Sequence, residues 1–146
     1  MAMEIVVGFP GGDRVDASFG SFTVHTDQTK GPGVHGSAPT PFQTFLAALA
    51  ACAGFYVLSF CRQRAIPVDG IRLVQRTETD SATHLVARVL IDIEVPESFP
   101  AKYQPALVRA AEQCTIKKHL EHPPAFAIAT RVVAATNGAL APRSAA

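Results

Sequence analysis

The stretch TPFQTFLAALAACAGFYVLSFCRQRAIP, from Thr40 to Pro67, determines the fold class. Thr40 is a good helix N-cap, Pro41 suits the first helical position, and Gln43 completes the pattern of a capping box. The helix has to end before Pro67, because a proline disfavours helical geometry in the residue ahead of it. These signals predict one long helix over residues 41–64.

The apolar character of this helix raises the question of a membrane span. Residues 45–61 are apolar except for Ser59, but the segment falls short of the ~20 residues that a bilayer core requires. A helix that is hydrophobic on all sides is also typical of the centre of a protein core. We therefore expect a buried central helix and no membrane partner.

The segments around the helix are short and rich in β-formers, with turn residues between them. Strands are expected at 4–9, 14–17, 21–26, 71–79, 85–95 and 126–134. Two shorter helices are expected at 100–113 and 115–120, and 27–39 is expected to be a loop. Helices separated in sequence from antiparallel strands indicate an α+β fold.

Length and composition favour a single domain that forms an oligomer. A chain of 146 residues fits one domain over residues 1–146, with 136–146 as a disordered tail. The hydrophobic fraction is 48% and the charged fraction 17%, an apolar excess that a subunit interface would cover. The net charge is +1 and the basic residues are scattered, which argues against nucleic acid as a partner.

The N-terminus and the cysteine content favour a cytoplasmic location. Residues 1–7 contain neither a basic n-region nor a small-residue cleavage site, so we expect no signal peptide. The chain has three cysteines, an odd number that favours reduced thiols over a disulfide framework.

The three cysteines differ in their surroundings. Cys52 lies among small residues in the middle of the long helix, where it is either a small core residue or a thiol that another group can approach. Cys61 lies nine residues later, on the opposite face of the helix, and is expected to be structural. Cys114 precedes a short helix that carries Lys117 and Lys118, so a lowered thiol pKa is expected there, and it is the better reactive thiol on local sequence alone.

Histidine spacing offers only a weak metal site. His119 and His122 could share a helix face, with Cys114 as a distant third ligand, but prolines end that helix at once. No glycine-rich loop has the spacing of a nucleotide-binding motif. We expect no metal and no cofactor.

Three motifs together resemble the OsmC/Ohr family of osmotically inducible and organic-hydroperoxide-resistance proteins. They are Ala-Ala-Cys52, Arg62-x-Arg64-x-Ile66-Pro67 and Cys114-x-Ile116-x-x-x-Leu120, within a resemblance over about residues 3–135. The resemblance implies antiparallel sheets wrapped around a long central helix in an intertwined homodimer, with each site built at the interface.

The resemblance also implies a two-cysteine thiol peroxidase with a role in the oxidative stress response. Cys52 would attack an organic hydroperoxide, Cys114 would condense with the resulting sulfenic acid, and an external dithiol would reduce the disulfide. A thiolate in an apolar pocket needs a cation, and in this family a carboxylate orients that cation.

This chain lacks the carboxylate that the family has at the start of the long helix. The resemblance implies a Pro-Glu pair at the helix start, with the glutamate ten residues before Cys52; this chain has Phe42 at that position, followed by Gln43. The family arginine corresponds loosely to Arg14, or its place is held by His25, which is either a partner for the thiol or a strand-end residue in a loop. An apolar wall suited to an alkyl or aryl peroxide is expected from Phe42, Gln43, Phe45, Phe55 and Tyr56.

The missing carboxylate leaves the enzymatic activity open. The alternative is a non-catalytic dimer that binds a small apolar ligand or senses redox state.

Overall fold

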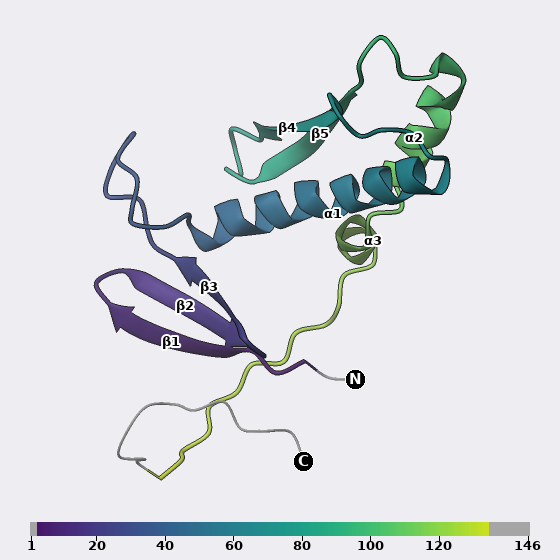
Figure 1. The fold of residues 1–146 in the computed structure, drawn as a ribbon. Coiled ribbons are helices and arrows are strands. Elements are labelled where there is room, and N and C mark those ends of the chain that lie inside the picture. Colours follow the sequence, from purple (N-terminus) through teal and green to yellow (C-terminus); the bar gives the residue numbers. More distant parts are fainter. Residues whose placement is uncertain (1–2, 135–146) are drawn as a thin grey trace. The chain divides into compact units, whose positions relative to one another are not determined.

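The computed structural model describes residues 3–134, which divide into two compact units. Of the described residues, unit 1 comprises 3–44 and 125–134, and unit 2 runs from Phe45 to Pro124. The architecture is α+β with antiparallel sheets, as the sequence predicts (Figure 1). The expected disordered tail at 136–146 lies outside the described residues.

Unit 1 contains a three-stranded antiparallel meander in the order β1-β2-β3. Its strands are β1 (Val6–Gly11), β2 (Arg14–Phe19) and β3 (Phe22–Thr26). The β1–β2 turn requires glycine, because Gly11 and Gly12 have φ values of 136° and 60° that other residues rarely adopt. The expected meander is therefore confirmed.

The loop between β3 and the long helix is held together by Asp27, which is 3% exposed. Its Oδ2 accepts hydrogen bonds of 2.8 Å from both the amide and the hydroxyl of Ser37, and its Oδ1 accepts one of 2.8 Å from the Gln28 amide. Gly36 is required here, because a Cβ at that position would lie 2.4 Å from the Gln28 carbonyl oxygen. The loop therefore has a defined path without helix or strand.

The Asp27 contacts should make stability depend on acid pH. Hydrogen bonds from Ser37 and Gln28 lower the pKa of Asp27 from 3.8 to about 2. A lowered folded-state pKa stabilises the protein above about pH 4, and this contribution is lost as pH falls towards about 2. The gap in unfolding free energy between wild type and Asp27→Asn, measured by urea titration, should therefore narrow between pH 4 and pH 2. A gap that stays constant from pH 7 to pH 2 would contradict this account.

The long helix α1 (Pro41–Gln63) begins with the predicted capping box. The Thr40 amide donates to Gln43 Oε1 at 2.9 Å, and the Gln43 amide donates to Thr40 Oγ1 at 3.2 Å. At the other end Ala65 has a φ of 52°, and the Ile66 amide donates to the Cys61 carbonyl at 2.9 Å. The chain thus leaves the helix directly ahead of Pro67, as expected.

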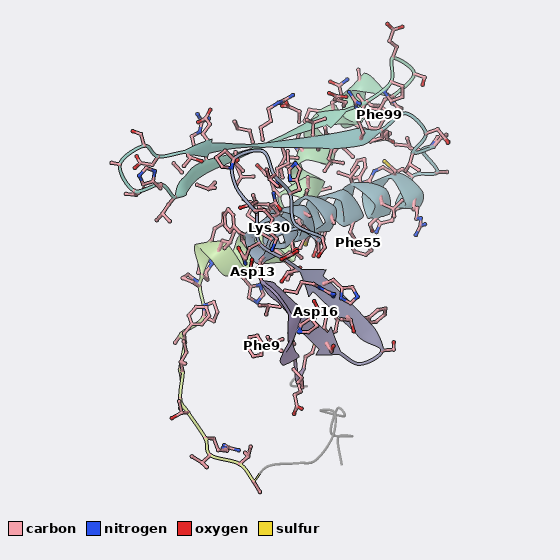
Figure 2. The ribbon with its side chains drawn as sticks, turned by 90° about the vertical axis from the view of Figure 1, so that its left-hand side faces the viewer. Phe9, Asp13, Asp16, Lys30, Phe55 and Phe99 are labelled. Carbon is pink, nitrogen blue, oxygen red and sulfur yellow. The ribbon has the colours of Figure 1, made fainter. Side chains whose placement is uncertain are left out.

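The prediction that α1 is buried on all sides is wrong. In a single chain, only one side of the helix is buried. Its buried residues form one stripe: Leu49, Ala53, Val57, Phe60 and Cys61. Phe55 on another face is 61% exposed (Figure 2). α1 is also long and apolar enough to cross a membrane, a test that the core helix of a soluble protein passes as well.

Unit 2 packs a β-hairpin and small helices around α1 (Figure 1). The hairpin consists of β4 (Arg72–Thr79) and β5 (Val86–Glu94), and it is followed by a 3-10 turn (Ala101–Tyr103), α2 (Gln104–Ala111) and α3 (Thr115–Glu121). One core cluster joins these elements through Val57, Phe60, Cys61, Phe99 and Leu107. These bounds confirm the expected hairpin and the two helices.

The strand predicted at 126–134 is wrong, because residues 123–134 form neither strand nor helix. A strand requires a hydrogen-bonded neighbour, and no described strand pairs with this segment. Its apolar side chains are largely exposed, with 85% for Phe126, 96% for Ile128 and 99% for Val132. The segment is apolar, as its sequence shows. A strand forms only beside a partner strand, however, and the apolar pattern does not specify that partner.

Candidate thiol site

The structure brings Cys52 and Cys114 together in unit 2. Cys52 lies in the middle of α1 and is partly buried, whereas Cys114 caps the N-terminus of α3 and is 2% exposed. Both thiols are free and within hydrogen-bonding reach of each other. They share a core cluster with Leu49 and Ala53, so two residues that are distant in sequence form one local pair.

Backbone amides favour the thiolate form of Cys52. Burial acts to raise the pKa of this thiol, but hydrogen bonds from the Ile116 amide, the Cys114 thiol and the Thr115 amide outweigh it and hold the pKa below its usual value. No basic side chain of residues 45–124 is among these contributions. Within unit 2, backbone amides at the start of α3 therefore contribute to lowering the pKa of this thiol.

The expectation of a lowered pKa at Cys114 is wrong. Burial raises the pKa of the Cys114 thiol, and the neighbouring Cys52 adds to the rise although the Lys117 and Ile116 amides oppose it. The lysine side chains contact other groups: Lys117 Nζ lies 3.1 Å from Glu121 Oε1, and Lys118 Nζ donates to Gln113 Oε1 at 2.8 Å. Lys117 interacts with the sulfur through its backbone amide, which donates to Cys114 Sγ at 3.5 Å, and not through its ammonium group.

Tyr56 connects α1 to the turn that supplies these amides. Its hydroxyl lies 2.9 Å from Thr115 Oγ1, in hydrogen-bonding contact. Tyr56 stands one helical turn after Cys52, so the bond holds the start of α3 beside the thiol. The Tyr56 ring also contacts that of Phe55, with centroids 5.7 Å apart.

Cys61 lies away from the pair, as the helical spacing predicts. It is fully buried in the cluster with Val57 and Leu107. Burial raises the pKa of its thiol, and only the charge of Arg64 opposes the rise. Cys61 is therefore a core residue.

A cavity of about 560 Å³ adjoins Cys114 within unit 2. Its wall is mostly apolar and comes from α1, β5, α2 and α3, with Leu49, Ala53, Ile91, Val108, Ala111 and Leu120 among the lining residues. None of the five residues expected to form an apolar wall is among them. Phe42, Phe45 and Phe55 are 53%, 36% and 61% exposed, and the side chain of Gln43 is used in the capping box.

Arg14 and His25 meet in unit 1 around a carboxylate that the sequence analysis missed. Asp16 Oδ2 accepts from Arg14 Nη2 at 2.9 Å and lies 2.7 Å from His25 Nδ1. The hydrogen bond from His25, with the charge of Arg14, lowers the pKa of Asp16 against the effect of burial. The strand register could have revealed this cluster, because Asp16 pairs with His25 and lies two residues after Arg14.

The two histidines near Cys114 do not join it in a cluster. His119 Nδ1 lies 2.8 Å from the Thr115 carbonyl oxygen, and His122 ends α3. Among residues 3–134 no group of three His, Cys, Asp or Glu side chains has an arrangement suited to a metal ion.

Comparison with solved structures finds the same fold in several bacterial proteins. A Psychrobacter arcticus protein, described as a candidate osmotic stress induced and detoxification response protein, is 21% identical with a TM-score of 0.65, over 78% of this chain and 85% of that one. An OsmC-like protein of Vibrio cholerae is 14% identical with a TM-score of 0.60, over 83% and 94%. At these identities the likeness concerns the fold.

A third structure is the organic hydroperoxide resistance protein OhrB of Bacillus subtilis. It is 18% identical with a TM-score of 0.51, over 84% of this chain and 93% of that one. A comparison with curated protein sequences finds no match. The model of the OsmC-like protein family matches residues 34–129, which include α1, both site cysteines and the hairpin between them. This chain therefore belongs to the OsmC-like protein family.

Proposed function

We propose that the protein reduces organic hydroperoxides with Cys52 and Cys114 and acts in the oxidative stress response. The observation that carries the proposal is the pairing of a thiol of lowered pKa, Cys52, with a second thiol in hydrogen-bonding reach. The fold shared with a hydroperoxide resistance protein agrees with it. We further propose that the protein works as a cytoplasmic homodimer, in which a second copy covers apolar side chains such as Phe55.

The chemistry proceeds in two steps. The Cys52 thiolate attacks one oxygen of the hydroperoxide, so that an S–O bond forms as the O–O bond breaks, and the released alkoxide takes a proton to leave as an alcohol. Cys114 then attacks the sulfur of the sulfenic acid, which forms a disulfide and releases water. The two thiols supply the two electrons, and an external dithiol restores them.

The environments of the two thiols determine which of them acts as the nucleophile. The interaction between the two thiols lowers the pKa of Cys52 and raises that of Cys114, so ionisation is favoured at Cys52. Cys52 is thus the nucleophile and Cys114 the resolving residue. The roles of Arg14 and His25 in supporting the thiolate stay predictions, and we propose Asp16 as the carboxylate that orients these two side chains.

Stoichiometric oxidation tests the proposal directly. One equivalent of cumene hydroperoxide should convert two of the three thiols to a disulfide, and peptide mapping by mass spectrometry should place it between Cys52 and Cys114. Cys61 should stay alkylatable after denaturation, because it is buried in another cluster. Three intact thiols after this treatment would refute the peroxidase proposal.

A second candidate is a non-catalytic dimer that binds a small apolar ligand or senses redox state. The departure at the helix start favours it, because Phe42 stands in place of the carboxylate and the side chain of the next residue, Gln43, is used in the capping box. Slow formation of the disulfide by hydroperoxide, without turnover in excess dithiol, would support this candidate.

A further inference from the structure

A second cavity lies at the carboxyl end of α1, within unit 2. Its volume is about 460 Å³, and it shares no lining residue with the cavity beside Cys114. One part of its wall is Arg64-x-Ile66-Pro67, the second half of a motif that the thiol site does not use. Arg64 follows Cys52 by twelve residues, a rise of about 18 Å along a helix. This cavity is therefore distinct from the thiol pair.

Two aromatic rings hold the side chain of Arg64 in position. Its Cζ atom lies 3.8 Å from the centroid of the Phe60 ring and 5.8 Å from that of the Tyr103 ring. The two rings pack edge to face with their centroids 6.0 Å apart. A guanidinium has five N–H donors, and among the described residues its one hydrogen-bond partner is the Phe60 carbonyl oxygen, 3.4 Å from Nη1. The other donors of Arg64 are available to a ligand.

Lys102 brings a second positive charge to the same ring, with its Nζ atom 5.0 Å from the Tyr103 centroid. The three arginines of the β4–β5 hairpin each form an ion pair with a carboxylate. Within residues 3–134, by contrast, neither Arg64 nor Lys102 forms one. Asp69 also lines the cavity, but it lies beyond ion-pair distance of both cations. The described part of the lining thus carries two positive charges against one negative charge.

The remaining wall of the cavity indicates the rest of the ligand. It is largely apolar and includes Ile66, Pro67, Pro96, Phe99 and Pro100. These side chains and the Tyr103 ring provide a surface against which a flat apolar group packs well. The volume falls within the usual range of small-molecule sites. A guanidinium fork matches the two oxygens of a carboxylate or a phosphate group.

We propose that this cavity binds a small aromatic molecule that carries an oxyanion. Arg64 donates hydrogen bonds to the oxyanion, Lys102 adds a second positive charge, and the aromatic ring packs against the apolar wall. This inference goes beyond the proposed function and does not depend on it, because no thiol takes part in binding. Cys52→Ala should accordingly bind the same ligands with wild-type affinity.

Titration of the isotopically labelled, reduced full-length chain with benzoate tests the proposal, with backbone amide chemical shifts as the measurement. We expect saturable shifts centred on residues 64–69 and 96–103, which contain the cavity lining. Benzyl alcohol has the same ring without the charge, so it should bind about tenfold more weakly. Absence of saturable shifts in these segments, or equal affinities for the two compounds, would overturn the proposal.

Two further compounds define the ligand class. Tighter binding of phenyl phosphate than of benzoate identifies an aryl phosphate, and the opposite order identifies an aryl carboxylate; both orders support the site. Inorganic phosphate supplies the oxyanion without the ring, and it should bind more weakly than phenyl phosphate. Equal affinities for these two phosphates would show that the apolar wall contributes nothing, and would overturn the proposal of an aromatic ligand.

The two arginines of the motif provide a matched pair of variants. Arg64→Gln removes the charge from the cavity, whereas Arg62→Gln makes the same change at an exposed residue outside the lining. Arg64→Gln should weaken benzoate binding by about tenfold, because a charge-assisted hydrogen bond is lost. Arg62→Gln should match wild type. Equal benzoate affinities for Arg64→Gln and wild type would overturn the proposal.

Lys102→Gln keeps the proposal testable if Arg64→Gln fails to fold. Lys102 is exposed in the short turn ahead of α2, so its replacement leaves the core intact. We expect benzoate to bind roughly twofold to fivefold more weakly, since the loss is that of an exposed charge pair. Unchanged binding in this variant would overturn the assignment of Lys102 to the site.

Discussion

Cys52→Ala should lower the turnover of cumene hydroperoxide in excess dithiol by roughly a thousandfold or more, because it removes the nucleophile. The structure gives the reason for assigning this role to Cys52: its thiol has the lowered pKa, supported by the Ile116 and Thr115 amides and by Cys114. The measurement is the loss of peroxide over time at neutral pH. A Cys52→Ala variant that keeps the wild-type rate would remove the basis of the peroxidase proposal.

Cys61→Ala is the matched control, since it makes the same change on the same helix. Cys61 lies in the other core cluster and its thiol has a raised pKa, so turnover per folded molecule should stay at the wild-type level. Cys114→Ala should behave differently from both. Without reductant it should consume one equivalent of peroxide and stop with a sulfenic acid at Cys52, which dimedone labels.

Leu107→Ala should lower the free energy of unfolding by about 2–5 kcal/mol, which is the usual cost of truncating a buried leucine. Leu107 is 2% exposed and packs in one cluster with Val57, Phe60, Cys61 and Phe99. The cavity left by the missing carbons cannot close fully, since its neighbours belong to α1 and to the chain before α2. Urea denaturation followed by circular dichroism gives the value.

The same leucine-to-alanine change at Leu85 serves as the control for Leu107. Leu85 is 68% exposed at the β4–β5 turn, so the loss there should be below about 0.5 kcal/mol. Equal losses at the two positions would show that the cluster around Leu107 does not carry the stability of unit 2.

The elements with strong local signals could be predicted from the sequence. The capping box of Thr40 and Gln43 set the start of α1, and Pro67 set its end. The period-two pattern gave the β4–β5 hairpin, whose register pairs Leu73 with Ile93 and Gln75 with Ile91. In each case the deciding interactions lie between residues that are close in the chain or joined by a short turn.

The predictions that were wrong concern features that depend on contacts between residues distant in the sequence. Whether 126–134 becomes a strand depends on a partner, which the segment's own composition does not provide. The lowered pKa expected at Cys114 from its local sequence was wrong, because burial raises the pKa of that thiol. The amides of Thr115 and Ile116 instead lower the pKa of Cys52. The sequence analysis did not identify Asp16, because it considered only the start of α1 as the position of the family's carboxylate. Asp16 instead lies opposite His25 in the antiparallel sheet.

The groups that make Cys52 acidic all lie between residues 52 and 116, within one compact unit, and Tyr56 fastens them in place. The Arg14–Asp16–His25 cluster belongs to the other unit. Substitutions in the first forty residues therefore leave these main-chain contributions to the ionisation of the sulfur in place. The main-chain share of the sulfur's acidity is thus maintained by unit 2 alone, whatever side chains selection retains in unit 1.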